Sequence, residues 1–286
     1  MSASALINPL TVNNFRKDKV ITAQEIWTDV VALRSKAPLV HNITNYVVMN
    51  TTANALLAIG ASPVMAHAVQ EVEEIVKLAA TVGGSLVINI GTLSSRWVKS
   101  MARAMKAAKE HHVPIVFDPV GAGASGYRTA TSKRLLETFS PTVIRGNASE
   151  IAAITDHSAR TKGVDSTLSS SDVFQTAQTL AAKTSCTVCV SGQVDLVTDG
   201  VRSAHIRNGH PLMRKVTGLG CTSTALIAAF LAVNSNAFAA TSHAMAVMGI
   251  CGELAAQQAS GPGTLQLYLY DALYNLNQNQ IETLLK

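Results

Sequence analysis

Short runs of apolar residues alternate along the chain with longer stretches in which apolar positions recur every three or four residues. The runs predict buried strands and the stretches predict amphipathic helices. Their regular alternation predicts a parallel sheet covered on both faces, because parallel strands need helical crossovers. The predicted strands lie at 39–41, 63–65, 85–90, 114–118, 142–145 and 187–190, and the predicted helices at about 23–36, 46–58, 71–82, 95–111, 129–139 and 171–183.

The C-terminal third departs from this pattern. Residues 195–208 predict a β-hairpin with Asp199-Gly200 as its turn. Three helices follow, near 221–233, 236–258 and 264–281. Residues 216–252 hold no Asp, Glu, Lys or Arg, but Asn234-Ser235-Asn236 interrupts them, so two buried helices fit better than a membrane span.

These elements together predict an α/β fold, a three-layer α/β/α sandwich with a mostly parallel central sheet. We expect a single domain over residues 21–286, preceded by a loose N-terminal extension at 1–20. The Ser-, Thr- and Gly-rich segment 157–170 is expected to be a loop. Thr22 and Glu25 have the spacing of a capping box, which predicts where the first helix begins.

Composition narrows the function classes. Of the 286 residues, 48% are hydrophobic and 14% charged, which excludes a mainly disordered chain. The net charge of +5 invites a nucleic-acid interpretation, but the basic residues are scattered, so an anionic small-molecule substrate is favoured over nucleic acid. Four cysteines, three of them in apolar segments, indicate free thiols in a reducing compartment, and hence a cytoplasmic protein without a membrane anchor.

Polar residues and glycines follow the predicted strands. In open parallel sheets, ligands bind beyond the carboxyl ends of the strands, so these residues are expected along one rim. Their mixture of amides, a carboxylate, a guanidinium and glycines suits a small polar molecule and phosphates. The rim residues are His41-Asn42, Met65-Ala66, Asn89–Gly91, Asp118, Arg145–Asn147 and Ser191-Gly192.

A glycine-rich segment opens the first C-terminal helix. Gly218 and Gly220 let the backbone turn so that several N–H groups face one point, and the helix N-terminus adds partial positive charge. A transferring phosphoryl group fits there. The alternative is an ordinary glycine turn with a Ser or Thr cap.

A second segment begins where a predicted strand ends at Asp118, which is placed to hold Mg²⁺ or its water. Arg128 is placed to reach phosphate oxygens. Glycines within 121–126 also match G-x-G-x-x-G, which offers a dinucleotide-binding alternative. That fingerprint turns directly from strand into helix, whereas here the predicted helix starts only after Arg128.

A third segment, Arg145–Glu150, follows a strand and begins a helix. Asn147 or Ser149 fits a helix cap, and Glu150 in the first turn suits the helix dipole. The functional alternative is that Glu150 orients Mg²⁺-bound water beside Asp118.

The amides between His41 and Asn50 need hydrogen-bond partners if they are buried. A neutral heterocycle would supply them. The alternative is helix capping by Thr44 or Asn45. The chain holds no P-loop and no zinc-ligand motif, and Cys186 and Cys189 fall on opposite faces of one predicted strand.

The motifs in this order resemble the hydroxyethylthiazole kinase family, thiamine-pathway enzymes with a ribokinase-like fold. The resemblance runs from about residue 23 to 281. It is carried by His41–Asn50, Ala61–Ala66, Asn89–Leu93, Asp118–Gly121, Arg145–Glu150, Val190–Gly192 and Gly218–Cys221.

The resemblance implies transfer of the ATP γ-phosphoryl group to 4-methyl-5-(2-hydroxyethyl)thiazole, with Mg²⁺ as cofactor, in a homotrimer whose sites lie at subunit interfaces. Each implied role attaches to residues of this chain. Gly218, Gly220 and Cys221 are implied as catalytic; Met65, Gly218, Asn42 and Asn45 as thiazole-binding; Arg128, Ser191 and Asn147 as ATP-binding; and Asp118 and Glu150 as serving Mg²⁺.

Most ribokinase-like kinases end the glycine motif in Asp, whereas Cys221 stands there in this chain. A thiolate base is one interpretation. We prefer that Cys221 lines the hydroxyl site, because the loose transition state of phosphoryl transfer depends chiefly on positioning and charge stabilisation. Alternatives within the fold are a pyrimidine-alcohol kinase and an ATP-dependent NAD(P)H-hydrate dehydratase. Two further alternatives are a Rossmann oxidoreductase and a non-catalytic nucleotide-binding module.

Overall fold

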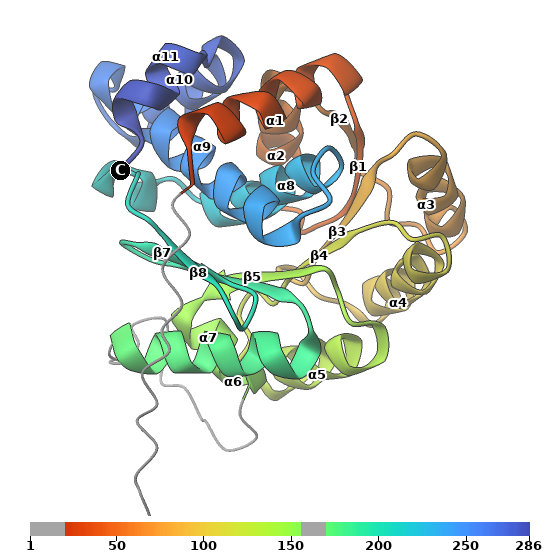
Figure 1. The fold of residues 1–286 in the computed structure, drawn as a ribbon. Coiled ribbons are helices and arrows are strands. Elements are labelled where there is room, and N and C mark those ends of the chain that lie inside the picture. Colours follow the sequence, from red (N-terminus) through yellow and green to blue (C-terminus); the bar gives the residue numbers. More distant parts are fainter. Residues whose placement is uncertain (1–20, 156–169) are drawn as a thin grey trace, which may run out of the picture.

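An eight-stranded sheet crosses the middle of the molecule (Figure 1). Its order is β2-β1-β3-β4-β5-β6-β7-β8. The strands from β2 to β6 are parallel, and β7 and β8 add an antiparallel hairpin at one edge. The strands are β1 (Leu39–Ile43), β2 (Ser62–Val64), β3 (Ser85–Asn89), β4 (Ile115–Asp118), β5 (Val143–Asn147), β6 (Thr187–Ser191), β7 (Asp195–Thr198) and β8 (Ser203–Ile206).

Helices cover both faces of the sheet (Figure 1). On one face lie α1 (Ala23–Lys36), α2 (Met49–Ile59), α8 (Leu219–Leu231), α9 (Ala237–Gln258), α10 (Pro262–Asn275) and α11 (Gln278–Leu284). On the other lie α3 (Val72–Thr81), α4 (Ser95–Glu110), α5 (Gly126–Phe139), α6 (Ala148–Thr155) and α7 (Ser170–Thr184). The computed structural model describes residues 21–155 and 170–286, so the expected extension at 1–20 and nearly all of the expected loop at 157–170 lie outside the described residues.

The sheet separates two hydrophobic cores. Consecutive residues of one strand join opposite cores, as Val116 and Phe117 of β4 do, because successive side chains of a strand point to opposite faces. Cys186 and Cys189 also join opposite cores, as predicted. The prediction of a three-layer α/β/α sandwich with a mostly parallel sheet is therefore confirmed.

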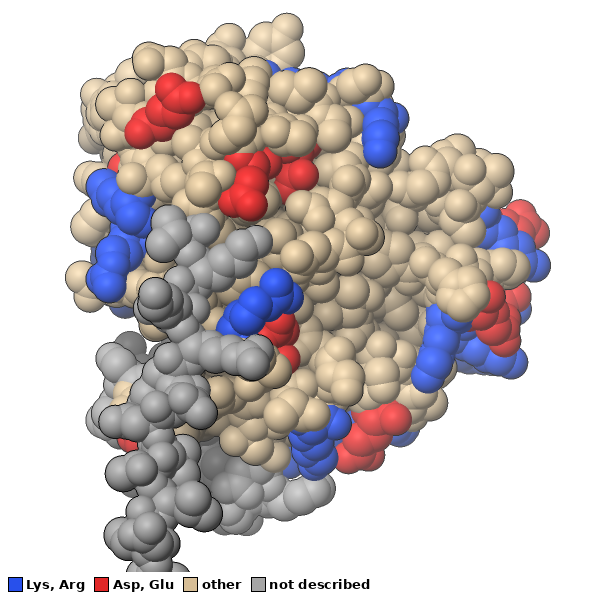
Figure 2. All heavy atoms as spheres, viewed as in Figure 1, with Lys and Arg blue, Asp and Glu red and all other residues tan. Residues whose placement is uncertain are grey.

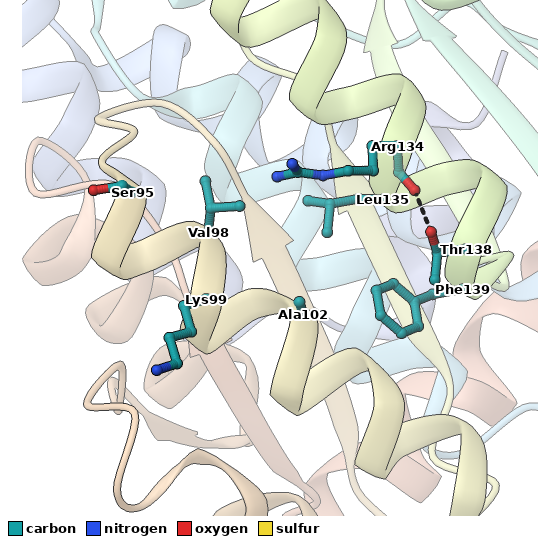
Figure 3. A pocket seen from close by; sticks show the side chains of 8 residues that line it. All are labelled: Ser95, Val98, Lys99, Ala102, Arg134, Leu135, Thr138 and Phe139. Carbon is teal, nitrogen blue, oxygen red and sulfur yellow. Dashed lines mark hydrogen bonds between the residues drawn. The ribbon is translucent and has the colours of Figure 1, made fainter.

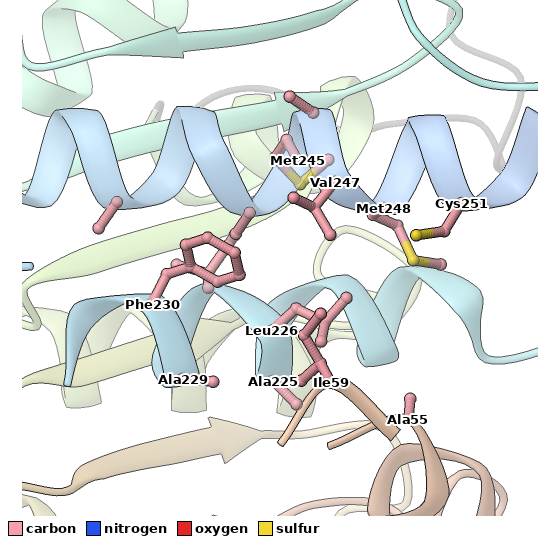
Figure 4. Packing of buried hydrophobic residues seen from close by; sticks show 14 of the residues in the cluster. Ala55, Ile59, Ala225, Leu226, Ala229, Phe230, Met245, Val247, Met248 and Cys251 are labelled. Atoms are coloured by element: carbon pink, nitrogen blue, oxygen red, sulfur yellow. The ribbon is translucent and has the colours of Figure 1, made fainter. Parts of the chain in front are cut away.

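The uncharged stretch 216–252 forms α8 and the first part of α9, two helices that pack against each other (Figure 4). Within the described residues, α9 is the one helix long and apolar enough to cross a membrane by length and composition. In its most apolar window, 89% of the residues are buried inside the protein. The prediction of two core helices broken at Asn234–Asn236 is confirmed.

Several element boundaries differ from the sequence prediction. The helix expected from residue 129 begins at Gly126, because the Ser125 hydroxyl accepts from the Arg128 backbone N–H and caps it. The helix expected over 264–281 is two helices, since Asn277 caps α11. The 3₁₀ turn Pro211–Lys215 was not predicted from the sequence.

Two predictions about caps have opposite outcomes. Thr22 and Glu25 form the predicted capping box at α1. Neither Thr44 nor Asn45 caps α2, which begins at Met49 without a side-chain cap. The Asn45 Oδ1 atom instead accepts from the Val47 backbone N–H in a local turn.

Candidate active site

The carboxylate of Asp118 lies fully buried at the carboxyl end of β4. Its Oδ2 atom accepts hydrogen bonds from Asn89 Nδ2 (2.9 Å) and Thr224 Oγ1 (2.7 Å). Its Oδ1 atom is buried with no hydrogen-bond partner among the described residues. Such an oxygen is unusual, because buried polar atoms nearly always have partners, and it is available to a ligand.

Burial raises the pKa of Asp118 to about 6. Arg145 opposes this rise through its charge, and Glu150 adds to it. The ionised form is therefore held at neutral pH at a cost that a bound cation would relieve.

Arg145 on β5 links the carboxylate to the next strand. Its Nη1 atom lies 3.9 Å from Asp118 Oδ2, and its Nη2 atom donates to the Ser191 hydroxyl on β6 at 2.7 Å. The side chain is largely buried, and its Nε has no partner among the described residues. A buried guanidinium with unused donors fits a phosphate.

The glycine motif brings the N-terminus of α8 against this guanidinium. Gly218 has φ +85°, and a Cβ there would lie 2.5 Å from Val48 Cγ1. A Cβ on Gly220 would lie 2.8 Å from Arg145 Nη1. No side chain caps α8, so the alternative of a Ser or Thr cap is wrong and the first-turn N–H groups face the site.

Cys221 stands in the first turn of α8. Its Sγ atom accepts from Asn45 Nδ2 at 3.4 Å, and the same Nδ2 donates to Asn89 Oδ1 at 2.9 Å. Burial raises the pKa of Cys221 to about 11, so the thiol is protonated near neutral pH. This favours a neutral group lining the site over a resident thiolate base.

Asn147 and Glu150 form a reciprocal cap at the start of α6. Asn147 Oδ1 accepts from the Glu150 backbone N–H (2.9 Å), and Glu150 Oε2 accepts from the Asn147 N–H (2.8 Å). Glu150 Oε1 accepts from the Gly121 N–H at 2.8 Å, which ties the loop after β4 to α6. Capping by Asn147 is confirmed, and Ser149 takes no part in it.

Arg128 is bound to backbone carbonyl groups. Its Nη1 atom donates to Val120 O (2.7 Å) and Ile90 O (3.0 Å), and its Nη2 atom donates to Gly91 O. The guanidinium therefore holds together the loops after β3 and β4. Its implied contact with ATP stays a prediction.

The residues implied for the thiazole lie around β1 and β2. Met65 is partly exposed directly after β2, and His41 Nε2 lies 2.8 Å from the next carbonyl, that of Ala66. Burial lowers the pKa of His41, so the neutral ring donates through Nε2 and fixes this loop. Asn42 is fully buried, with Nδ2 on the Val40 carbonyl and Oδ1 without a partner among the described residues.

A shallow groove between α4 and α5 contains none of these residues (Figure 3). In Figure 3 the Arg134 side chain extends toward Val98, and Lys99 points away from the groove. No strand end and no part of α8 reaches it, so we place the site at the carboxyl rim. The groove is lined by Ser95, Val98, Lys99 and Ala102 of α4 and by Arg134, Leu135, Thr138 and Phe139 of α5.

A profile of the hydroxyethylthiazole kinase family matches residues 30–279. The chain belongs to this family. It is 55% identical over 262 residues to a hydroxyethylthiazole kinase of Syntrophus aciditrophicus, covering 91% of this chain and 96% of that protein. The structure of a hydroxyethylthiazole kinase from Pyrococcus horikoshii matches with a TM-score of 0.84 at 44% identity, over 92% of this chain and 98% of the other.

More distant proteins share the fold of this hydroxyethylthiazole kinase family member. A ribokinase-like superfamily protein from Enterococcus faecalis matches with a TM-score of 0.58 at 14% identity, over 88% of this chain and 94% of the other. This likeness concerns the fold alone. Family membership makes the Rossmann oxidoreductase alternative wrong, and Gly121 and Gly123 instead adopt positive φ in the loop that follows β4.

Three residues at the centre of the candidate site have no role predicted from the sequence. Arg145 and Asn89 were placed on the rim without a function, and Thr224, six residues after Gly218, received neither a place nor a function. The available signal for Arg145 was a guanidinium at the end of a predicted buried strand. Nothing local distinguished Asn89 or Thr224, because their partners lie on other elements.

Proposed function

We propose that the chain transfers the γ-phosphoryl group of ATP to the hydroxyl of 4-methyl-5-(2-hydroxyethyl)thiazole, giving the thiazole phosphate for thiamine biosynthesis or salvage. The observation that carries the proposal is the position of Arg145. Its guanidinium lies against the first turn of α8 and 3.9 Å from the Asp118 carboxylate. Cationic donors and helix N–H groups meet where a transferring phosphoryl group needs charge stabilisation.

The phosphoryl group lies, in this proposal, over the N-terminus of α8. The backbone N–H groups of Gly220 and Cys221 face its oxygens, and Arg145 stabilises the charge that develops on them. Ser191 of β6 and Asn147 of β5 are neighbours in the sheet and form the edge of the site where the nucleotide lies. All are preorganised by the sheet, so little reorganisation accompanies transfer.

The acceptor lies on the opposite side of α8. Met65 and Gly218 line the thiazole pocket, with Asn45 beside the hydroxyl and Asn42 in the wall behind. The Asn45 amide touches Cys221 Sγ, which supports placing the hydroxyl between them. A neutral thiol positions that hydroxyl, and the hydroxyl proton passes to an oxygen of the transferred phosphoryl group, because the loose transition state needs no strong base.

Mg²⁺ fits the donor set of Asp118 and Glu150. Asp118 Oδ1 is an unpartnered buried oxygen, and Mg²⁺ is commonly bound by one or two carboxylates together with substrate phosphates. Among the described residues, no cluster of three or more His, Cys, Asp or Glu side chains is arranged to hold a metal. The ion would neutralise phosphate charge during transfer.

The direct test is ADP release from Mg-ATP with hydroxyethylthiazole, beside a blank without acceptor and a pyrimidine alcohol. We expect release that depends on the thiazole. Equal release with the pyrimidine alcohol would broaden the acceptor class. No thiazole-dependent release from folded, ATP-binding protein would overturn the assignment and direct the search to other alcohols and hydrated dinucleotides.

Cys221→Ser is expected to keep measurable turnover, with kcat lowered by about tenfold or less. Its thiol has a pKa of about 11 and is not ionised near neutral pH, so a hydroxyl of similar size can line the site. Steady-state kinetics at pH 8 measures the effect. Loss of all turnover in folded Cys221→Ser protein would instead favour a thiolate base.

A homotrimer with sites at subunit interfaces is part of the proposal. Tyr46 and Val47, next to Asn45 in the site, are 63% and 61% exposed. Exposed apolar side chains beside a site are typical of surfaces that a partner covers. In the helical layer that contains α1, α2 and α10, Val31, Leu57, Leu267 and Tyr274 are also exposed.

Val47→Asp tests this assembly. A buried carboxylate at the interface should shift the trimer toward monomer in sedimentation velocity and lower kcat with it, because each site loses its neighbour. Val201→Asp, in the hairpin turn far along the chain, is the matched exposed control. A trimer that survives Val47→Asp would place the interface elsewhere.

We propose the cytoplasm as the compartment, supported by four free cysteines. On the face shown in Figure 2, charged side chains of both signs are scattered between wide uncharged areas. That face offers no continuous basic surface of the kind that nucleic acid binds.

A further inference from the structure

The two oxygens of the Asp118 carboxylate have unequal surroundings. Oδ2 is held by Thr224 Oγ1 at 2.7 Å and by Asn89 Nδ2 at 2.9 Å, whereas Oδ1 has no hydrogen-bond partner among the described residues. Turning the plane of the carboxylate away from these two donors would break both bonds inside a fully buried environment. The two donors therefore fix the carboxylate plane and with it the position of the free oxygen.

Asn89 is itself fixed in one orientation. Its Oδ1 atom accepts from Asn45 Nδ2 and from the Gly91 backbone N–H, each at 2.9 Å. With the amide oxygen so engaged, the NH₂ group must face Asp118. Asn45 in turn touches Cys221, so one chain of hydrogen bonds joins the acceptor side of the site to the carboxylate.

Thr224 connects Asp118 to α8. It stands in the second turn of the helix whose N-terminus holds the glycine motif, and it is fully buried. Its hydroxyl also lies 3.3 Å from the Gly220 carbonyl oxygen one turn earlier. The bond to Asp118 therefore fixes the distance between the carboxylate and the N–H groups that face the phosphoryl.

We propose that Thr224 and Asn89 are positioning residues that hold Asp118 Oδ2 and thereby keep Oδ1 free and aimed at the reacting groups. Neither touches substrate. Thr224 fixes the position of the carboxylate relative to α8, and Asn89 fixes its position relative to the acceptor side of the site. The inference rests on the proposed role of Asp118.

Thr224→Val is the principal test variant, because it removes the hydroxyl at nearly constant volume. We expect kcat to fall on the order of tenfold, as for loss of one hydrogen bond to a charged group, with KM for thiazole and ATP changed less than about threefold. Thr224→Ser keeps a hydroxyl and should restore kcat to within about threefold. Asn89→Ala is the second variant and should lower kcat in the same way.

Thr222→Val is the matched control. Thr222 is also buried on α8, but its hydroxyl lies 3.5 Å from that of Thr52 and makes no contact with Asp118. The kcat of Thr222→Val should stay within about twofold of that of the unaltered protein. Mn²⁺ affinity in the presence of ADP, followed by electron paramagnetic resonance, should weaken in Thr224→Val and stay unchanged in Thr222→Val.

A double-mutant cycle separates positioning through Asp118 from a general effect on stability. Added to Asp118→Asn, Thr224→Val should change the residual kcat less than about twofold. Three results would each overturn the inference. Thr224→Val could lower kcat as much in the Asp118→Asn background as in the unaltered protein. Thr224→Ser could fail to restore kcat, or the Mn²⁺ affinity of Thr224→Val could equal that of Thr222→Val.

Failure of the proposed function has a different signature. If unaltered protein releases no thiazole-dependent ADP, the substrate assignment fails, while the Mn²⁺ measurement still tests the positioning. If Asp118→Asn keeps full kcat, the role of Asp118 fails and takes this inference with it.

Discussion

Arg145→Met is expected to lower kcat for thiazole phosphorylation on the order of 10³-fold, the scale seen when a charge-stabilising cation is removed from phosphoryl transfer. Among the described residues, this guanidinium is the one cationic group that contacts both Ser191, a proposed nucleotide-side residue, and the carboxylate of Asp118. Methionine keeps much of the apolar stem but removes every donor. The charge that develops on the phosphoryl oxygens then has only helix N–H groups beside it.

The measurement is kcat and KM at saturating thiazole, with circular dichroism to establish folding. Arg134→Met, exposed on α5, is the control and should keep kcat within about twofold. A kcat for Arg145→Met within tenfold of the unaltered protein would show that the phosphoryl group does not pass this side chain.

Arg128→Met is expected to lower stability, whereas Arg145→Met is expected to lower kcat. The family resemblance implies that Arg128 contacts ATP, whereas its guanidinium bonds carbonyl groups of Ile90, Gly91 and Val120. Loss of these bonds should lower the thermal midpoint clearly, because charged hydrogen bonds stabilise by about 1.5–3 kcal/mol each. A rise in KM for ATP without loss of stability would instead support the contact with ATP.

Regular elements could be predicted from the sequence because their signals are local. The run Leu86–Asn89 and the turn at Asp199-Gly200 predict a strand and a hairpin by periodicity and turn chemistry alone. The break between α10 and α11 was missed although Asn277 and Gln280 have the capping-box spacing, because apolar periodicity continues across it. The start of α5 was missed because Ser125 stands among glycines.

The site could be predicted only in part. The rim residues follow from the rule that parallel strands end at one edge, and Asp118, Asn147 and Glu150 do lie there. Which side chain bonds which could not be predicted, since Thr224 and Asp118 are 106 residues apart and their contact depends on how α8 packs over β4. The contacts of Arg128 with backbone carbonyl groups and of Arg145 with Ser191 could not be predicted for the same reason.

Asp118→Asn is expected to lower kcat by about 10²- to 10³-fold, because the neutral amide cannot stabilise a cation or offer the free Oδ1 charge. Asp271→Asn, exposed on α10, is the control and should keep kcat within about twofold of the unaltered protein.

The decrease of kcat/KM at acid pH should also differ between unaltered protein and Asp118→Asn. The pKa of Asp118 is about 6, so kcat/KM of unaltered protein should fall below about pH 6 as the carboxylate takes up a proton, and Asp118→Asn should lack this dependence.

Asp118→Asn is expected to lower kcat without lowering thermal stability at pH 8. The pKa of Asp118 is raised from 3.8, so the folded protein favours the neutral group, and its contribution to stability grows as pH falls from about 6 toward 3.8 and is lost above about 6. At pH 8 the always-neutral amide removes that penalty, and it can still accept from Thr224 and Asn89. The thermal midpoint of Asp118→Asn at pH 8 should therefore equal or exceed that of unaltered protein. A clearly lower midpoint would mean that the ion pair with Arg145 outweighs burial, in which case the lost kcat would reflect a distorted site.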